Sequence, residues 1–441
     1  MTPLPSPQRR REIIDALRRG TVPQRGLDAF AVGIDGFVPA IDEGLDSVAG
    51  GAGQFKAVRG EYGSGKTFFS RWLAEHAKAR GLATAEIQIS ETETPLHKLE
   101  TVYRRLVERL STADTPDGAF RSVLERWTYT LEEEVLAVGD VREAETDELA
   151  RRVDALMEQR LAEVSKSAPA FATAVRAQRA AAMAGDRALA EGTLAWLGAQ
   201  PTVPAAIKRA AGVKGEIDND GALAFLRGLL TILRDAGHPG LLVILDEIET
   251  LQRVRSDVRE KALNALRQLI DEIDGGRFPG LYLVITGTPA FYDGSQGAQR
   301  LAPLAQRLHT DFTGDPRFDN PRAVQLRLPA FNRERLVQVG TRVRDIYADG
   351  GANSARIHAK VDDAYVETLA AAVAGELGGD VGIAPRVFLK KLVGDVLDRV
   401  DQFDDFDPRQ HYALTINATE LTAEEHERRA AASVDDIDLD L

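Results

Sequence analysis

The period of hydrophobic and polar positions changes along the chain, and each period predicts a different element. Residues 55–59 read as a short strand, residues 68–80 as a helix, and residues 82–90 as a strand with alternating apolar positions. A glycine, Gly81, marks the end of the helix. This part of the chain therefore predicts a strand, a loop, a helix and a second strand.

The same alternation of strands and helices returns after residue 240. Residues 241–245 and 281–285 are continuous apolar runs, which are typical of buried strands in a parallel sheet. A helix over about 257–273 separates them, and the alternating residues 322–328 predict a last strand. We therefore expect an α/β fold with a parallel, three-layer α/β/α core.

The remaining segments show helical periodicity. Helices are predicted at 9–19 and 37–48, and residues 96–235 are mostly helical. Within this region Leu149 to Val164 mark one face of a helix, and Leu223 to Leu233 mark a face of another. Four parts are expected: an N-terminal helical segment with a nucleotide-side loop (1–54), a core (55–330) with a helical insertion of about 113–220, a helical lid (331–400), and an extension with an acidic tail (401–441).

Composition narrows the function classes. The chain of 441 residues has no cysteine, which excludes disulfides, thiolate metal sites and cysteine nucleophiles and fits a cytoplasmic protein. No apolar run approaches the roughly 20 residues that a membrane span needs, and no export signal is predicted. The net charge of −13 opposes approach to nucleic acid, so DNA could bind only at a local basic face.

The stretch GEYGSGKTFF, residues 60–69, matches G-x-x-x-x-G-K-[ST] at every fixed position. In such a loop, backbone N–H groups surround an anion, the lysine reaches the β- and γ-phosphates, and the hydroxyl binds Mg²⁺. The predicted strand before it and helix after it disfavour a chance glycine-rich turn. The residues expected to bind the nucleotide are Gly60, Gly63, Ser64, Gly65, Lys66 and Thr67.

A second element is the apolar strand in LLVILDEIE, which ends in Asp246 and Glu247. Carboxylates at the carboxyl end of a parallel strand lie in the crevice where ligands bind. We expect Asp246 to hold Mg²⁺ and Glu247 to orient and deprotonate the attacking water. An ordinary strand followed by an acidic helix start is the alternative.

Three further positions could complete the site. The strand in LYLVITGTP ends near Thr286 and Thr288, either of which could bond the γ-phosphate or the water. Arg386 lies near the start of a predicted lid helix, where it could contact the γ-phosphate. Arg307, or Arg300 before it, could act as an arginine finger toward a neighbouring subunit, although surface arginines are common.

Taken in order, these elements resemble an AAA+ ATPase of the origin-recognition-like initiator branch. More narrowly, the chain resembles the BrxD family, ATP-binding proteins of BREX phage-defence systems. The segments that carry this resemblance are VPQRGLDAFAVG (22–33), FKAVRGEYGSGKTFF (55–69), ISETETPLHKLETVYRRL (89–106), LVILDEIETLQR (242–253), ITGTPAFYDG (285–294), GIAPRVFLKKLV (382–393) and DPRQHYALTI (407–416).

The resemblance implies an ATPase that uses ATP and Mg²⁺ in an anti-phage complex with methyltransferase and helicase-like partners. An arginine finger that acts on a neighbouring subunit would require a homo-oligomer. We also expect no membrane association and action on double-stranded DNA, either directly or through partners. By motif, the resemblance assigns Gly60, Gly63, Gly65, Lys66 and Thr67 to Walker A, Asp246 and Glu247 to Walker B, Thr288 to sensor 1, Arg386 to sensor 2, and Val22 and Pro23 to the adenine side.

Two departures leave the mode of action open. The helical insertion makes the distance from the phosphate loop to Asp246 unusually long, and about forty residues after 400 are too few for a winged-helix DNA-binding domain. One hypothesis is an oligomeric ATPase that works on DNA or a DNA-bound partner. The alternative is a slowly hydrolysing, ATP-gated switch or scaffold that recruits partner proteins. A small-molecule kinase is a third class, which Glu247 and Arg386 disfavour.

Overall fold

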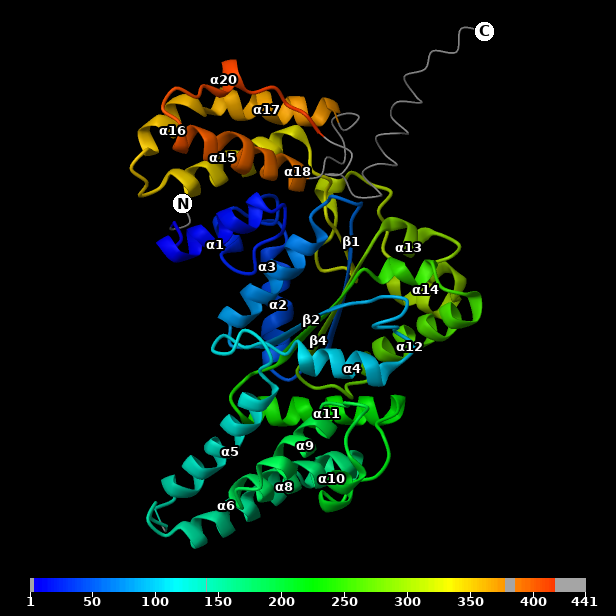
Figure 1. The fold of residues 1–441 in the computed structure, drawn as a ribbon. Coiled ribbons are helices and arrows are strands. Elements are labelled where there is room, and N and C mark those ends of the chain that lie inside the picture. The colour runs from blue at the N-terminus through cyan, green and yellow to red at the C-terminus, as the bar shows by residue number, and fades with distance from the viewer. Residues whose placement is uncertain (1–3, 140, 377–384, 417–441) are drawn as a thin grey trace. The chain divides into compact units, whose positions relative to one another are not determined.

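The computed structural model describes residues 4–139, 141–376 and 385–416 (Figure 1). The predicted acidic tail and residues 382–384 of the predicted lid motif lie outside these ranges. By its internal contacts the chain divides into two compact units. The first contains residues 1–39, 58–75 and 311–441, and the second contains residues 40–57 and 76–310.

The sheet has five strands in the order β2-β3-β4-β1-β5. They are β1 (Gln54–Arg59), β2 (Ala83–Gln88), β3 (Leu241–Asp246), β4 (Leu281–Gly287) and β5 (Gln325–Arg327). The pairs β2–β3 and β3–β4 are parallel, and Leu241 is in register with both Ala83 and Leu281. Each strand falls within or close to a predicted range, so the predicted α/β fold with a parallel sheet is confirmed.

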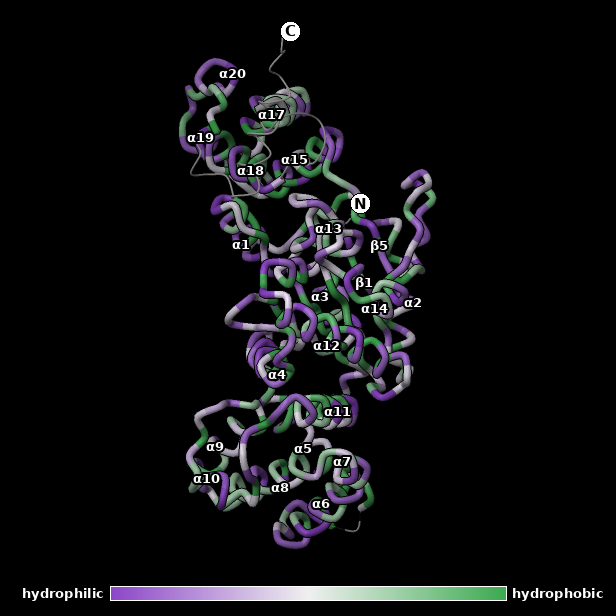
Figure 2. Tube along the Cα trace, turned by 90° about the vertical axis from the view of Figure 1, so that its right-hand side faces the viewer, coloured by the Kyte–Doolittle hydropathy of each residue, from purple (hydrophilic) through white to green (hydrophobic). Residues whose placement is uncertain are grey.

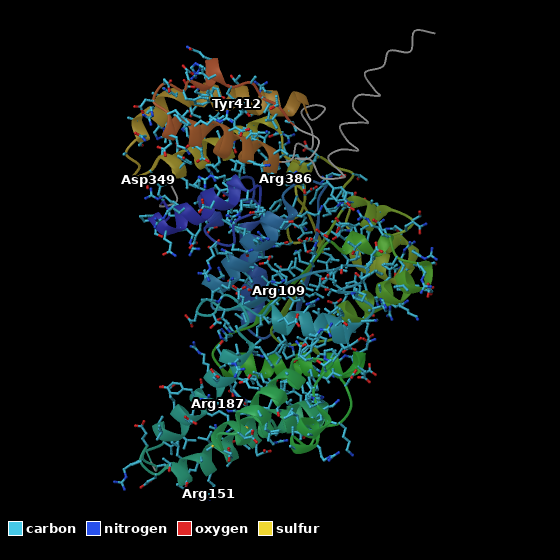
Figure 3. The ribbon with its side chains drawn as sticks, in the orientation of Figure 1. Arg109, Arg151, Arg187, Asp349, Arg386 and Tyr412 are labelled. Carbon is cyan, nitrogen blue, oxygen red and sulfur yellow. The ribbon has the colours of Figure 1, made fainter. Side chains whose placement is uncertain are left out.

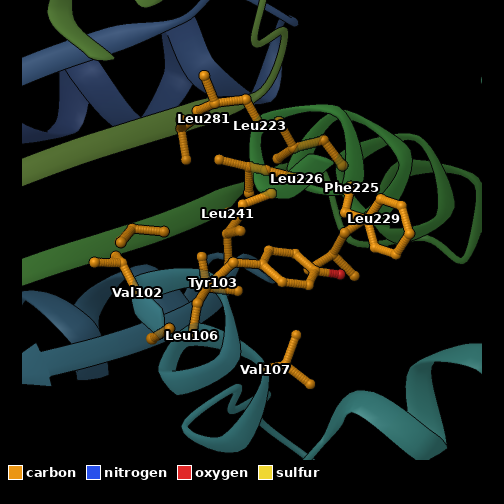
Figure 4. Close-up of a cluster of buried hydrophobic side chains, with 14 of the residues drawn as sticks. Val102, Tyr103, Leu106, Val107, Leu223, Phe225, Leu226, Leu229, Leu241 and Leu281 are labelled. Atoms are coloured by element: carbon orange, nitrogen blue, oxygen red, sulfur yellow. The ribbon is translucent and has the colours of Figure 1, made fainter. Parts of the chain in front are cut away.

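In the second unit, helices cover both faces of the central strands. Val243, Leu245 and Leu283 point to one face, where they are buried with side chains of α4 (Leu99–Glu108), α11 (Asn219–Asp235) and α12 (Ser256–Asp274). Figure 4 shows part of this cluster, with Leu241 and Leu281 of the strands beside Leu223 and Leu226 of α11. Tyr282 points to the opposite face, toward α2 (Val38–Ala49), where a Cβ on Gly44 would lie 2.9 Å from its hydroxyl oxygen. Burial there raises the pKa of Tyr282 to about 12.

The helices between α4 and α11 form a separate layer of the second unit (Figure 1). They are α5 (Phe120–Ala137), α6 (Thr146–Arg160), α7 (Ala162–Ser167), α8 (Pro169–Met183), α9 (Arg187–Leu197) and α10 (Ala205–Ala210). Phe225 of α11 joins this layer to the core, because its ring lies 5.1 Å from that of Phe171, 5.5 Å from that of Trp196 and 6.0 Å from that of Tyr103.

One predicted helix face is interrupted. The apolar stripe from Leu149 to Val164 was expected on a single helix, but α6 ends at Arg160 and α7 begins at Ala162. The residue between them, Leu161, is fully buried, so the helix breaks while its apolar side chain stays in the core. Most of the α6 surface is hydrophilic, and Figure 2 shows this helix largely in purple.

In the first unit, α1 (Pro7–Arg18) packs against the C-terminal helices. These are α15 (Arg333–Ala348), α16 (Ser354–Lys360), α17 (Asp363–Glu376), α18 (Pro385–Lys390), a π-helical segment Lys391–Leu397, α19 (Asp398–Gln402) and α20 (Pro408–His411). The contacts of α1 are with α15, α18 and the π-helical segment. The helical N-terminus is therefore part of the same packed group as the predicted lid.

Both apolar and charged contacts fix α1. Ile13, Ile14 and Leu17 are buried. The Arg18 guanidinium donates to the Asp398 carboxylate at 2.6 and 2.8 Å. The hydroxyl of Tyr347 donates to the same carboxylate at 2.8 Å, and burial together with this bond raises the pKa of Tyr347.

The remaining helices and turns complete the described chain. They are α3 (Lys66–Ala79), α13 (Pro289–Asp293) and α14 (Ala302–Leu308), with 3₁₀ turns at Leu27–Ala29, Ile248–Gln252, Ala298–Arg300 and Pro316–Phe318. Among the helices of residues 4–139, 141–376 and 385–416, none combines the length and the apolar character required to cross a membrane.

The packing of the C-terminal helices predicts different effects of the same substitution at two glycines. A Cβ on Gly340 would lie 2.7 Å from Phe388 and 2.8 Å from Val366, whereas a Cβ on Gly394 would meet nothing closer than 3.9 Å. Gly340→Ala should lower the free energy of unfolding by about 1–3 kcal/mol because it overpacks this core.

Gly394→Ala is the matched control and should be neutral or should stabilise by up to about 1 kcal/mol, as alanine normally does in a helix. Urea unfolding of the full chain measures both variants. Equal changes in the two would contradict this account of the packing around Gly340.

Candidate functional site

The loop between β1 and α3 has a backbone that requires its glycines. Gly63 has φ of 78° and Gly65 has φ of 89°, a region that residues with a Cβ rarely adopt. At Gly60 an added Cβ would lie 2.3 Å from the hydroxyl oxygen of Ser64. Local geometry therefore explains why positions 60, 63 and 65 are glycine.

The side chains of this loop fit an anion. Lys66 is only 9% exposed, and its Nζ donates to the backbone oxygen of Gly60 at 2.9 Å and to that of Glu61 at 3.4 Å. The hydroxyl of Ser64 is buried and has no hydrogen-bond partner among the described residues. A buried cation and a buried hydroxyl at the N-terminus of α3 are groups that a phosphate would satisfy.

The residues predicted near the adenine lie beside the helix that follows the loop. Arg71 of α3 donates to the backbone oxygen of Val22, and Pro23, the next residue, is buried. Further along α3, the carboxylate of Glu75 accepts bonds from backbone N–H groups of the same segment. The phosphate loop, Val22 and Pro23 thus belong to one unit and are held together through α3.

Arg386 belongs to this unit as well. It is the second residue of α18 and is half-buried, and Figure 3 labels it. A Cβ on Gly20, two residues before Val22, would lie 3.7 Å from its Nη1. The structure thus brings Arg386 against the start of the segment that carries Val22 and Pro23.

Thr67 and Asp246, the residues predicted to bind Mg²⁺, belong to different units. Thr67 is exposed in the first turn of α3. Hydroxyl and carboxylate oxygens are donors that Mg²⁺ accepts, so the donor types fit this ion. The two residues stay a predicted metal site.

In the second unit, four polar side chains meet in two pairs at the carboxyl ends of neighbouring strands. The carboxylate of Asp246 accepts a bond from the hydroxyl of Thr286 and, at 3.0 Å, from the backbone N–H of Glu247. Gln88, which is in register with Asp246, donates through its side-chain amide to the Glu247 carboxylate at 2.8 Å. The two adjacent carboxylates therefore have separate side-chain donors, Thr286 for Asp246 and Gln88 for Glu247.

Glu247 has an unusual backbone. Its φ of 61° and ψ of 41° place it in the left-handed region, which costs free energy for a residue with a side chain. Among the described residues, only Ala199 shares a positive φ without being glycine. Such a conformation persists where the surroundings impose it, and it is concentrated at functional sites.

The sequence did not single out Gln88, and it left the choice between two threonines open. Gln88 is a polar position in the alternating strand predicted at 82–90, and nothing in its local pattern separates it from a solvent-facing residue. Thr286 contacts Asp246, whereas Thr288 is buried at the start of α13 and its side chain makes no capping bond. The assignment of sensor 1 to Thr288 stays a prediction.

The two candidate finger arginines bond within their own chain. In α14, Arg307 pairs with Asp271 of α12 and donates to the backbone oxygen of Pro303 at 2.6 Å. Arg300 donates to the hydroxyl of Ser256 at 2.6 Å. These bonds would have to be exchanged for contacts with a neighbouring subunit, so a finger role also stays a prediction.

A protein-family model matches this chain over most of its length. The model of the BREX system ATP-binding protein BrxC/D matches residues 6–416. Comparison with curated proteins finds no match. The family match includes the phosphate loop, the Asp246–Glu247 strand and Arg386, and it extends over almost the whole described chain. The chain therefore belongs to the BrxC/D family of BREX system ATP-binding proteins.

Proposed function

We propose that this protein is an AAA+ ATPase that hydrolyses ATP with Mg²⁺ as a component of a BREX anti-phage defence complex. Membership of the family supports ATP binding and the BREX context. The single observation that carries the further step, hydrolysis, is the conformation of Glu247. This carboxylate is adjacent to a second one, is held by Gln88, and sits on a backbone that is costly for a non-glycine residue.

A hydrolytic site needs a base whose position is fixed before the substrate arrives. Placing one residue in the left-handed region costs on the order of 1–3 kcal/mol, which a solvated surface glutamate would have no reason to incur. The side-chain amide of Gln88 donates to the Glu247 carboxylate at 2.8 Å and so fixes its orientation. Glu247 is thus suited to accept a proton from water.

The other residues have complementary roles in this proposal. Lys66, Ser64 and the backbone of the glycine loop bind the triphosphate, and Arg386 approaches it from the C-terminal helices. Thr67 and Asp246 hold Mg²⁺, which neutralises charge on the phosphoryl oxygens when bound. Thr288, or Thr286 in its place, bonds the γ-phosphate or the attacking water.

We further propose that the ATPase acts on DNA or on DNA-bound partners through ATP-dependent assembly of several subunits. Methyltransferase and helicase-like proteins of the defence system are the expected partners. The alternative is a slowly hydrolysing switch that recruits partner proteins without binding DNA. The net charge of −13 and the helices α5–α10, which lie outside the sheet layers, favour that alternative.

The roles of Lys66 and Glu247 predict two different defects. Glu247→Gln should keep ATP affinity and lower turnover by at least about 100-fold, because it removes the base but no phosphate contact. Lys66→Ala should abolish tight ATP binding, because it removes the buried cation. Calorimetric titration with ATP and a phosphate-release assay measure these two effects.

The matched control is Glu216→Gln, which makes the same change at an exposed residue and should leave both quantities unchanged. Turnover of Glu247→Gln near that of the unaltered protein would refute the proposed base. ATP affinity that survives in Lys66→Ala would refute the phosphate site itself.

The two threonines should also differ. Thr288→Val should lower turnover with ATP affinity retained, because its hydroxyl is the proposed partner of the γ-phosphate or the water. Thr286→Val should raise the Mg²⁺ concentration needed for half-maximal turnover, because it removes a bond that orients Asp246. A Mg²⁺ titration of phosphate release separates these effects, and the reverse result would assign the sensor role to Thr286.

Assembly and DNA action predict how turnover responds to concentration and to DNA. If a subunit completes its neighbour's site, turnover per subunit should rise as protein concentration rises. If DNA is a direct ligand, double-stranded DNA at low salt should stimulate turnover, and the stimulation should disappear as salt rises. A rate that is flat with concentration and indifferent to DNA would favour the switch.

A further inference from the structure

Both oxygens of one carboxylate of α3, that of Glu75, accept hydrogen bonds from the backbone of a segment distant in sequence. The two oxygens of Glu75 accept bonds from the N–H of Gly26 at 2.7 Å and from the N–H of Leu27 at 3.0 Å. Because α3 begins at Lys66, Glu75 lies on the same rigid helix as the phosphate-binding lysine. Any displacement of this segment relative to the phosphate loop must therefore break or bend these two bonds.

Two neighbouring side chains of α3 hold the same segment. Trp72 donates through its indole N–H to the Asp28 carboxylate at 2.6 Å, and Arg71 donates to the backbone oxygen of Val22. Positions 71, 72 and 75 lie on one side of a helix, since residues three and four apart are neighbours on its surface. Together these three side chains fix Val22 to Asp28 along α3.

The junction at Gly26 is built for this contact. Gly26 has φ of 78°, a conformation that favours glycine and turns its N–H toward Glu75. A Cβ at this position would lie 2.9 Å from Arg9 and 3.0 Å from Ile13 of α1. Gly26 therefore lies between helix α1 and Glu75. No residue larger than glycine would fit at position 26.

Residues 20–31, which we name the strap, also contact the C-terminal helices at both ends. At its start, a Cβ on Gly20 would lie 3.4 Å from Lys390 and 3.7 Å from Arg386 of α18. At its end, Arg342 of α15 donates to the backbone oxygen of Ala31. The strap is therefore fastened to α3 in its middle and to α18 and α15 at its ends.

A nucleotide has two ends, and different parts of this unit would bind them. The triphosphate would be bound by the loop and Lys66, whereas the adenosine end would lie against Val22 and Pro23 of the strap. The distance between these two binding surfaces is set by α3 and by the side chains that fasten the strap to it. Among those side chains, only Glu75 supplies two charged hydrogen bonds to the strap backbone.

We infer that Glu75 is a positioning residue that holds the strap at the distance from Lys66 that ATP requires. The inference rests on the proposed function, ATP binding at the phosphate loop, and on the predicted position of Val22 and Pro23 beside the adenine. Glu75 is not among the residues proposed to contact the nucleotide. It acts through the backbone of Gly26 and Leu27, and so it should affect ligands that reach the strap and spare ligands that reach only the phosphate loop.

The test compares ATP with inorganic tripolyphosphate, which has the phosphates and lacks the adenosine. In Glu75→Gln the side chain keeps its shape but presents one acceptor oxygen, so one of the two strap bonds is lost. Titration calorimetry of the full chain with Mg²⁺ should show ATP affinity about tenfold weaker and tripolyphosphate affinity unchanged. Glu216→Gln is the matched control and should change neither affinity.

Trp72→Phe provides a second variant, because it keeps an aromatic ring and removes the bond to Asp28, together with part of the buried ring. It should weaken ATP binding in the same direction, again with tripolyphosphate binding retained. It also keeps the inference testable if Glu75→Gln does not fold.

Equal losses for ATP and tripolyphosphate would show that Glu75 merely supports the fold, and unchanged affinities would show that the strap position does not matter. Either result would overturn the inference while leaving ATP binding at Lys66 intact. A different failure, in which the unaltered protein binds neither ligand, would instead overturn the proposed function and this inference with it.

Discussion

Burial of β3 and β4 on both faces is the constraint on which the rest of the structure depends. A strand covered by helices on both sides must be apolar along its length, so polar side chains can appear only where the strand ends. Asp246 and Thr286 occupy these ends, and they bond each other instead of being left unsatisfied. The chemistry of the second unit is therefore a direct consequence of how completely its core excludes water.

In the first unit, the phosphate loop is held by its backbone geometry and by contacts of the helix that follows it. This loop relies on glycine backbone geometry, a buried lysine and the helix that follows. The strap provides hydrogen-bond partners for three side chains of that helix. The C-terminal helices in turn hold the strap at both ends. The bonds between the strap and α3 therefore support the phosphate loop without filling the space where a ligand would bind.

The sequence predicted the strands and the phosphate loop because these depend on local signals. Continuous apolar runs indicate β3 and β4, and the spacing of Gly60, Gly65 and Lys66 indicates the loop. The contacts of Gln88 with Glu247 and of Glu75 with Gly26 could not be predicted in the same way. Each joins positions that are distant along the chain, and neither leaves a pattern in the residues around it.

Local sequence patterns also failed to predict the packing partner of α1 and the break after α6. Periodicity predicted α1 as an amphipathic helix but could not identify the C-terminal helices as the surface that covers its apolar face. It also could not show that Leu161 interrupts a helix whose apolar stripe continues unbroken. The hydrophobic periodicity of a helix or strand indicates which of its faces is buried. It does not indicate which other element packs against that face, because this depends on the tertiary fold.

The packing of α1 against the C-terminal helices has a consequence for the order of folding during synthesis. Arg18 and Asp398, which bond each other, are 380 residues apart, so their contact must wait roughly 20 to 80 seconds at usual rates of translation. The second unit can fold within that interval, because its residues precede 311. Until the last helices emerge, the apolar face of α1 is exposed and is a surface that a chaperone would have reason to cover.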